Sequence, residues 1–199
     1  MVFLTDPNRK GILVILGFLA ALVVVALFAK ALAADEPAEV EGTFSQDVED
    51  VNKMISHLVG NYPQHPMNKG DWSTKMSKQI VSNANEHGAP VDLVTAISFR
   101  ESSLRWNLTG PGGELGIMQV HPFTIRKFKC DMDTVAGQID CGCRVLAWHH
   151  DRCGSDWKSA LAAYGSKTAN CHPKLGSKLS AMVKDRFKLA AELRKVADR

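Results

Sequence analysis

The chain has 199 residues, of which 45% are hydrophobic and 23% charged, so its composition is that of a globular protein with room for one domain and an appendage. The net charge of +3 conceals an uneven distribution, because residues 35–50 carry seven acids and no base, while residues 51–199 hold 21 Lys and Arg against 13 Asp and Glu. This basic body favours polyanionic partners such as cell-wall polymers or membrane surfaces, whereas the lack of Arg-rich runs and base-stacking motifs excludes nucleic acid as the expected partner.

The first predicted element is an apolar segment near the N-terminus. Residues 11–29 run for nineteen positions without a charge, which is about the length needed to cross the hydrocarbon core of a bilayer. Arg9 and Lys10 precede the segment and acidic residues follow it. The positive-inside tendency therefore places the N-terminus in the cytoplasm and the rest of the chain outside.

A cleaved signal peptide is the competing interpretation of this segment, because the sequence Ala-Leu-Ala at residues 31–33 fits a small-residue cleavage site. Residues 1–34 are therefore expected to be either a transmembrane anchor, held in the membrane through residues 11–33, or a signal segment. Both interpretations make the following part of the chain membrane-anchored or exported. In both, the folded domain lies in the periplasm or elsewhere outside the cytoplasm.

An acidic segment at residues 35–47 follows, and it contains Pro37 and Gly42 but no apolar periodicity. This composition predicts a flexible stalk. The folded domain is then expected to occupy residues 48–199.

That domain is predicted to be all-α, with at most one small hairpin, because apolar residues recur at helical spacing and no sustained alternating strands occur. The run Gly-Pro-Gly-Gly at residues 110–113 predicts a loop. The second of the predicted helices is expected to be capped by Asp71 or Ser73 and to end at Gly88. The other predicted helices cover residues 48–59, 91–102, 134–151, 156–164 and 175–196.

Five cysteines lie in the C-terminal third of the chain: Cys130, Cys141, Cys143, Cys153 and Cys171. In an exported domain, disulfides are the default expectation, with two bridges and one free thiol, and the sequence does not choose the pairing. A zinc site is the alternative, since Cys141, Cys143 and Cys153 lie near His149 and His150. Their spacing matches no standard zinc pattern, so no metal site is predicted.

Glu101 is the residue that best fits a catalytic acid. It ends a predicted helix whose preceding turns, residues 93–99, are strongly apolar. A carboxyl group placed there would be partly desolvated, and desolvation favours the protonated form that donates a proton near neutral pH. Glycosidic cleavage needs such an acid to protonate the leaving oxygen. Taken alone, however, a Glu at a helix end is more often a solvated residue or an ion-pair partner.

Three motifs in order strengthen this assignment. They are Ile-Ser-Phe-Arg-Glu-Ser-Ser at residues 97–103, Gly-Ile-Met-Gln at residues 116–119 and Ala-Ala-Tyr at residues 162–164. Together they resemble the motifs of the soluble lytic transglycosylase domain, in the goose-type lysozyme-like superfamily. The resemblance covers roughly residues 73–170. It implies an α-helical, lobed, lysozyme-like fold with a substrate cleft.

The resemblance also implies a reaction on peptidoglycan glycan strands. Glu101 would protonate the bond between N-acetylmuramic acid and N-acetylglucosamine and would then act as base toward the muramoyl C6 hydroxyl. The product is a 1,6-anhydro end, and no water is consumed. This chemistry needs neither a cofactor nor a second catalytic carboxylate.

Five further residues are candidates for substrate binding by the same resemblance. Gln119 is expected to bind substrate or brace the cleft floor, and Tyr164 to face Glu101 and hold it or the sugar. Gly116 would let the backbone approach the sugar, unless it is a plain turn glycine. The side chain of Met118 is expected to pack more than to contact substrate. Trp106 could stack on a sugar ring, although a half-buried core position is the alternative.

Hydrolysis is the alternative reaction, since goose-type lysozymes are thought to hold a water molecule with extra carboxylates. At one of the two corresponding positions this chain has His121, and the only acid of the loop is Glu114, which is expected to be either surface decoration or a water-positioning group. The chain also departs from the family pattern at Gly110, where a Ser is frequent, and at Gly165, where an Asn is frequent. Transglycosylation is therefore the favoured prediction.

A third possibility is a catalytically weak component of a virion or secretion apparatus that binds peptidoglycan. Retention of Glu101 favours the enzyme, because a pure binding protein needs no acid there. Local cell-wall cleavage would serve envelope-spanning assembly, phage entry or lysis. Virion or secretion-apparatus proteins are then candidate partners, beside peptidoglycan itself.

Overall fold

The computed structural model describes residues 38–166, 170–171 and 176–199. Contacts divide the chain into two units, Met1–Thr43 and Phe44–Arg199, and the core and pocket described below belong to the second unit. The apolar segment predicted at residues 11–33 lies outside the described residues. Among the helices of the described part, none is long and apolar enough to span a membrane.

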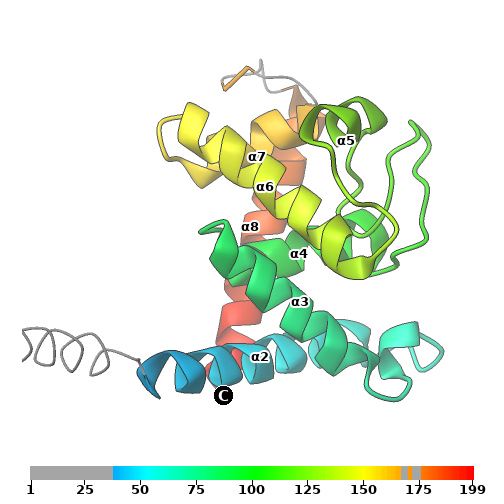
Figure 1. Ribbon diagram of the computed structural model, residues 1–199, viewed down its shortest axis with the longest axis vertical. Coiled ribbons are helices and arrows are strands. Elements are labelled where there is room, and N and C mark those ends of the chain that lie inside the picture. The colour runs from blue at the N-terminus through cyan, green and yellow to red at the C-terminus, as the bar shows by residue number, and fades with distance from the viewer. Residues whose placement is uncertain (1–37, 167–169, 172–175) are drawn as a thin grey trace, which may run out of the picture. The chain divides into compact units, whose positions relative to one another are not determined.

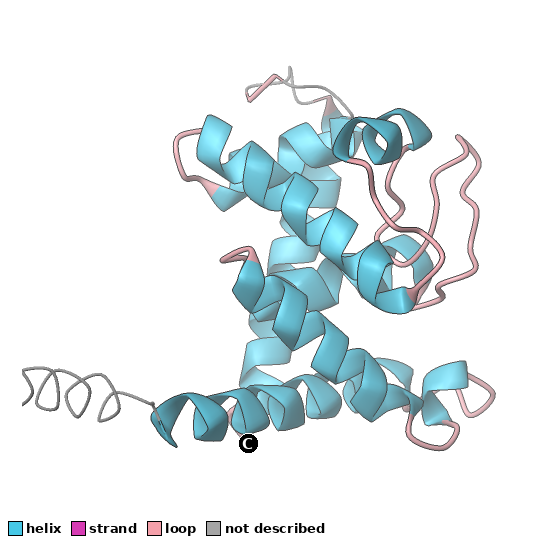
Figure 2. Cartoon of the chain, in the orientation of Figure 1, coloured by secondary structure: helices cyan, strands magenta, loops and turns pink. Residues whose placement is uncertain are grey.

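The described residues form seven α-helices and one short 3-10 helix, which confirms the prediction of a mainly α fold (Figures 1 and 2). In place of the hairpin that was allowed for, only isolated bridges join Thr109 to Leu115 and Leu115 to Val120 in this part of the chain. The elements are α2 (Ala38–Val59), η1 (Pro66–Asn68), α3 (Trp72–Glu86), α4 (Val91–Ser102), α5 (Pro122–Phe128), α6 (Val135–Arg152), α7 (Trp157–Ser166) and α8 (Ser177–Ala197).

Helix α2 begins at Ala38, so the predicted start at Val48 was wrong, and much of the segment predicted as a stalk is helical. The physical reason is that residues 42–46 are exposed, and an exposed stretch of helix needs no apolar face. Two short helices, η1 and α5, were not predicted. Each begins at a Pro whose preceding His caps it, with the Nδ1 atoms of His65 and His121 accepting from Met67 and Phe123 N–H, both at 3.2 Å.

Helix α4 is the centre of the core. Its residues 93–98 are all buried, and it contacts α3 and α8, while α6 contacts α3 and α7. The helix ends where Ser103 and Leu104 adopt left-handed backbone angles, with φ of 52° and 59°. The Ser103 N–H donates to the Phe99 carbonyl at 2.7 Å, and the Leu104 N–H donates to the Ser98 carbonyl at 3.3 Å. This reversal closes α4 directly after Glu101 and turns the chain toward the loop that carries the second motif.

Two disulfides join Cys130 to Cys141 and Cys153 to Cys171, and Cys143 is a buried free thiol. The expectation of two bridges and one free cysteine is confirmed. The zinc alternative is wrong, because Cys141 and Cys153 are taken up by the bridges. Burial, followed by the negative charge of Asp140, raises the pKa of the Cys143 thiol far above its usual value, so this thiol is unreactive.

Gly142 allows α6 to pack closely on the loop of residues 116–119. A Cβ at Gly142 would lie 2.2 Å from the Met118 sulfur and 2.8 Å from the Met118 Cβ, and the Met118 side chain is fully buried. We expect Gly142→Ala to lower the free energy of unfolding, measured in urea, because overpacking costs about 1–3 kcal/mol against a helix-propensity gain of roughly 1 kcal/mol. Gly42→Ala is the matched control, since a Cβ there meets nothing within 4 Å. Equal stability of the two variants would contradict this account of the packing.

Candidate active site

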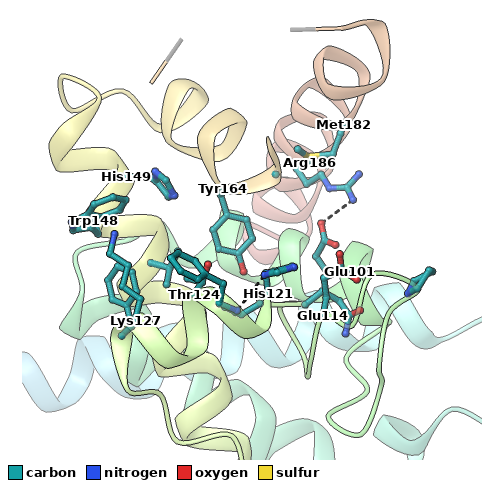
Figure 3. A pocket seen from close by; sticks show the side chains of 17 residues that line it. Glu101, Glu114, His121, Thr124, Lys127, Trp148, His149, Tyr164, Met182 and Arg186 are labelled. Carbon is teal, nitrogen blue, oxygen red and sulfur yellow. Dashed lines mark hydrogen bonds and ion pairs between the residues drawn. The ribbon is translucent and has the colours of Figure 1, made fainter. Parts of the chain in front are cut away.

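A pocket of about 450 Å³ opens between the last turn of α4, the loop of residues 111–121 and the helices α5 to α8. Its volume is within the usual range for ligand sites, roughly 300–1,000 Å³. Three of the sequence-predicted site residues, Glu101, Gln119 and Tyr164, line it. In Figure 3, Glu101 and Arg186 lie on one side, Lys127, Trp148 and His149 lie on the other, and Tyr164 lies between them.

Glu101 projects into this pocket from the last turn of α4, and its side chain is 26% exposed. It is therefore partly desolvated, as its apolar surroundings in the sequence predicted. Its carboxylate oxygen Oε1 lies 3.1 Å from a guanidinium nitrogen of Arg186 on α8. This partner was not predicted from the sequence.

Arg186 is itself held in place by a second acid. Its other terminal nitrogen lies 3.1 Å from Asp185, and the Nε atom of Arg100 lies 3.0 Å from the same Asp185 oxygen. The Arg186 side chain is only 15% exposed, and its Nε is buried without a hydrogen-bond partner. An ion-pair network thus joins the end of α4 to α8 and fixes the guanidinium beside Glu101.

Tyr164 lies in the pocket near Glu101, as its motif position predicted, but it does not hold the carboxylate. Its hydroxyl donates to the Met118 carbonyl at 2.7 Å. Burial, followed by the negative charge of Glu101, raises the pKa of Tyr164 well above its usual value, so the hydroxyl remains a neutral donor. Tyr164 therefore ties α7 to the loop of the second motif and forms one wall of the pocket.

Gln119 braces that loop. Its backbone is left-handed, with φ of 51°, and its Nε2 donates to the Gly116 carbonyl at 2.7 Å and to the Leu108 carbonyl at 3.2 Å. Gly116 has φ of 76°, and a Cβ there would lie 2.4 Å from Oε1 of Gln138. The turn therefore requires glycine at position 116 for backbone and packing reasons, and Gly116 is not among the residues that line the pocket.

The other two predicted substrate contacts lie outside the pocket lining. The Met118 side chain is fully buried, so it packs, as expected, and only its carbonyl serves the site by accepting from Tyr164. Trp106 is 47% exposed rather than in the core. Stacking of Trp106 on a sugar ring stays a prediction.

Glu114 and His121, the two positions that bear on hydrolysis, both line the pocket. Glu114 is partly buried, and its Oε2 accepts the Gly112 N–H at 2.9 Å, so it shapes the loop and is more than surface decoration. The Nδ1 of His121 accepts from the N–H of Phe123 and caps α5. These contacts give both side chains a structural role at the pocket edge.

The two glycine departures from the family pattern have a steric explanation. A Cβ at Gly165 would lie 2.2 Å from the terminal methyl of Met182, and a Cβ at Gly110 would lie 2.4 Å from the Gln119 Oε1. Met182 and Gln119 thus occupy the space that larger side chains would need. Both residues also line the pocket.

The far side of the pocket contains Lys127, Trp148 and His149. None of these was predicted as a substrate-binding residue, and His149 entered only as a zinc candidate. Among the residues that the structure describes, the metal-type ligands that come close together are Glu86, His87 and Asp140, away from the pocket. There His87 and Asp140 pair with each other at 2.7 Å, and Asp140 also pairs with Arg144 at 3.1 Å.

Comparison with known proteins supports the motif analysis. The family model described as the transglycosylase SLT domain matches residues 78–180. The matched stretch contains Glu101, Gln119 and Tyr164 and ends shortly before Arg186. No curated protein matches the chain.

Proposed function

The chain belongs to the transglycosylase SLT domain family, whose model matches over half of it, and we propose which bond it cleaves and which product it forms. Membership of this family gives the chain a peptidoglycan-degrading function of the lytic transglycosylase type. The chain cleaves the β-1,4 bond between N-acetylmuramic acid and N-acetylglucosamine and leaves a 1,6-anhydro end. The observation that carries this proposal is the placement of Glu101, partly desolvated, in a pocket next to a neutral tyrosine and a fixed guanidinium.

The reaction uses Glu101 twice. Its protonated carboxyl gives a proton to the glycosidic oxygen as the bond from that oxygen to the muramoyl C1 breaks, and the acetamido group of the same sugar stabilises the positive charge at C1. The resulting carboxylate then takes the proton of the C6 hydroxyl as the C6 oxygen bonds to C1. The proton that Glu101 donated is thereby restored, and no water enters the products.

Arg186 suits the second half of this cycle. Its guanidinium lies 3.1 Å from the carboxylate and can donate a hydrogen bond to Glu101 when that residue acts as base, whereas the first half requires a proton on Glu101. When the substrate binds, the ion pair between Glu101 and Arg186 must therefore break, or one oxygen of Glu101 must be protonated while the other still accepts from Arg186. Arg186 can remain bound to Asp185 while it does so, at 3.1 Å.

The product distinguishes this reaction from hydrolysis. We expect the full-length chain, incubated with purified peptidoglycan, to release fragments that end in 1,6-anhydro-N-acetylmuramic acid, because the C6 oxygen replaces water as the nucleophile. Mass spectrometry separates these from hydrolysed fragments, which are heavier by one water. Reducing ends alone would make the chain a muramidase and would move Glu114, the second pocket carboxylate, into the position of water-binding group.

We also propose that the domain acts outside the cytoplasm. The two disulfides support an oxidising compartment, and peptidoglycan lies there. Local cell-wall cleavage during envelope-spanning assembly, phage entry or lysis fits both the reaction and this location.

A further inference from the structure

On the side of the pocket away from Glu101, two cations contact the ring of Trp148, and of these Lys127 lines the pocket while Arg152 lies outside its lining. The ammonium of Lys127 lies 4.0 Å from the centre of the Trp148 ring, and the Arg152 guanidinium lies 4.7 Å from it. Phe128 packs edge-on against Trp148, with ring centres 5.7 Å apart. Helices α5 and α6 supply this cluster, which we call the basic aromatic end: Lys127, Phe128, Trp148, His149 and Arg152.

Positive charge at the basic aromatic end has no acidic counterpart in the described part of the chain. Lys127 and Arg152 have ring contacts there and no ion pair with a carboxylate. On the opposite side of the pocket, the positive charge of Arg186 is neutralised, because Arg186 forms ion pairs with both Glu101 and Asp185. Two cations beside one apolar ring, without an acid, form a site for an anionic ligand.

His149 adds a buried polar group to the same end. The residue is 6% exposed and lines the pocket, yet its Nδ1 has no hydrogen-bond partner. Burial, followed by the charges of Lys127 and Arg152, lowers the pKa of His149 to about 4. The imidazole is therefore neutral at pH 7, so it does not repel a cation and can donate or accept one hydrogen bond. A buried polar atom without a partner is uncommon in proteins and indicates an absent ligand or water.

We propose that the basic aromatic end binds a carboxylate of the peptide stem that branches from N-acetylmuramic acid, an inference that rests on the proposed function. The sugar rings of a glycan strand are uncharged, so the anions of the substrate are the carboxylates of the stem and, where the stem is removed, of the lactyl group. Tyr164 lies between the basic aromatic end and Glu101 (Figure 3). The basic aromatic end is therefore placed to bind a substituent that extends away from the sugar whose bond Glu101 cleaves.

The test compares glycan strands that carry stem peptides with the same strands stripped by an amidase. In the full-length chain, Lys127→Gln should lower the ratio of kcat/KM for peptide-bearing over stripped strands about tenfold, through KM, because a hydrogen bond to a charged group is worth roughly 1.4 kcal/mol or more. Lys127→Arg should restore the ratio. Arg126→Gln is the matched control, since Arg126 is exposed on the same helix outside the pocket lining, and it should keep the wild-type ratio.

Two results would overturn the proposal: an unchanged ratio in Lys127→Gln, with or without an equal loss on both substrates, and a loss confined to stripped strands, which would assign the carboxylate to the lactyl group. If the wild type cleaves neither substrate, the proposed function fails, but binding still tests the site. A disaccharide with its stem peptide should then bind Glu101→Gln about tenfold more tightly than the same disaccharide without it. It should also raise the pKa of His149 in an NMR titration, and equal affinity for the two ligands would count against the site.

Discussion

Glu101→Gln is expected to lower the rate of peptidoglycan cleavage by about a thousandfold or more, because one side chain supplies both the acid and the base of the proposed reaction, and proton transfer by a positioned group contributes roughly 10²–10⁴. The amide keeps the shape of the carboxyl group and can still accept a hydrogen bond from Arg186, which lies 3.1 Å away. We therefore expect sedimentation with peptidoglycan to be retained and the melting temperature to shift by less than about 4 °C.

Glu114→Gln is the matched control, since it makes the same change to the other acid that lines the pocket. If the C6 hydroxyl is the nucleophile, this variant should retain cleavage within about tenfold, because Glu114 then takes part in no proton transfer and accepts a hydrogen bond from Gly112 in the loop. Full activity of Glu101→Gln would remove Glu101 from the mechanism. A large loss in both variants, with reducing-end products, would favour hydrolysis. Wild-type protein that binds peptidoglycan without cutting it would favour the binding component.

The helices of the core could be predicted because their apolar residues recur at helical spacing and glycine or proline marks their ends. Helix α4 matches its predicted bounds, residues 91–102, and α8 differs from its prediction by a residue or two at each end. The failures have a common cause. Helices α5 and η1 are too short for a periodicity to develop, and residues 42–46 of α2 are exposed, so no apolar stripe marks that part of the helix.

Site residues were predicted only where they lie in one of the three short sequence motifs. Glu101, Gln119 and Tyr164 lie in three short motifs and meet at one pocket, whereas Arg186 lies beyond the third motif on the closing helix. A signal was nevertheless present, because Arg186 falls on the apolar stripe of α8, at helical spacing from Met182, Val183, Leu189 and Ala190. A charge on such a stripe indicates a buried partner, but the sequence does not say that the partner is Glu101.

His149 on α6 is likewise a polar residue on a buried helix face whose neighbours the sequence does not identify. It continues the buried stripe of Gly142, Val145 and Leu146, so a polar group is carried into the interior, and the proximity of Lys127 and Arg152 depends on how α5 packs against α6. The hydroxyl of Tyr164 likewise donates to the backbone carbonyl of Met118, which lies 46 residues earlier in the chain. Contacts of this kind follow from tertiary packing and leave no pattern in the sequence.

Acidification should destabilise the fold through His149. Its pKa is lowered from 6.5 to about 4, first by burial and then by Lys127 and Arg152, so the folded protein favours the neutral ring. Above pH 6.5 both the folded and the unfolded states hold neutral His149, and the residue contributes nothing to the pH dependence. As the pH falls from 6.5 toward 4, the unfolded state binds a proton that the folded state does not, so stability is lost across this window. At pH 5 the loss from this one group is about 2 kcal/mol.

The measurement is urea unfolding of the wild type and His149→Gln at pH 7 and pH 5. The other titrating groups are common to both proteins, so the difference between the two pH dependences isolates His149, and the variant should lose about 2 kcal/mol less than the wild type. If the wild type and His149→Gln lose equal stability between pH 7 and pH 5, His149 binds a proton as readily in the folded state as in the unfolded state. The cations of the basic aromatic end would then be compensated, and the site would have no need of an anionic ligand. The pH dependence therefore tests the electrostatics on which stem-peptide binding depends, without any substrate present.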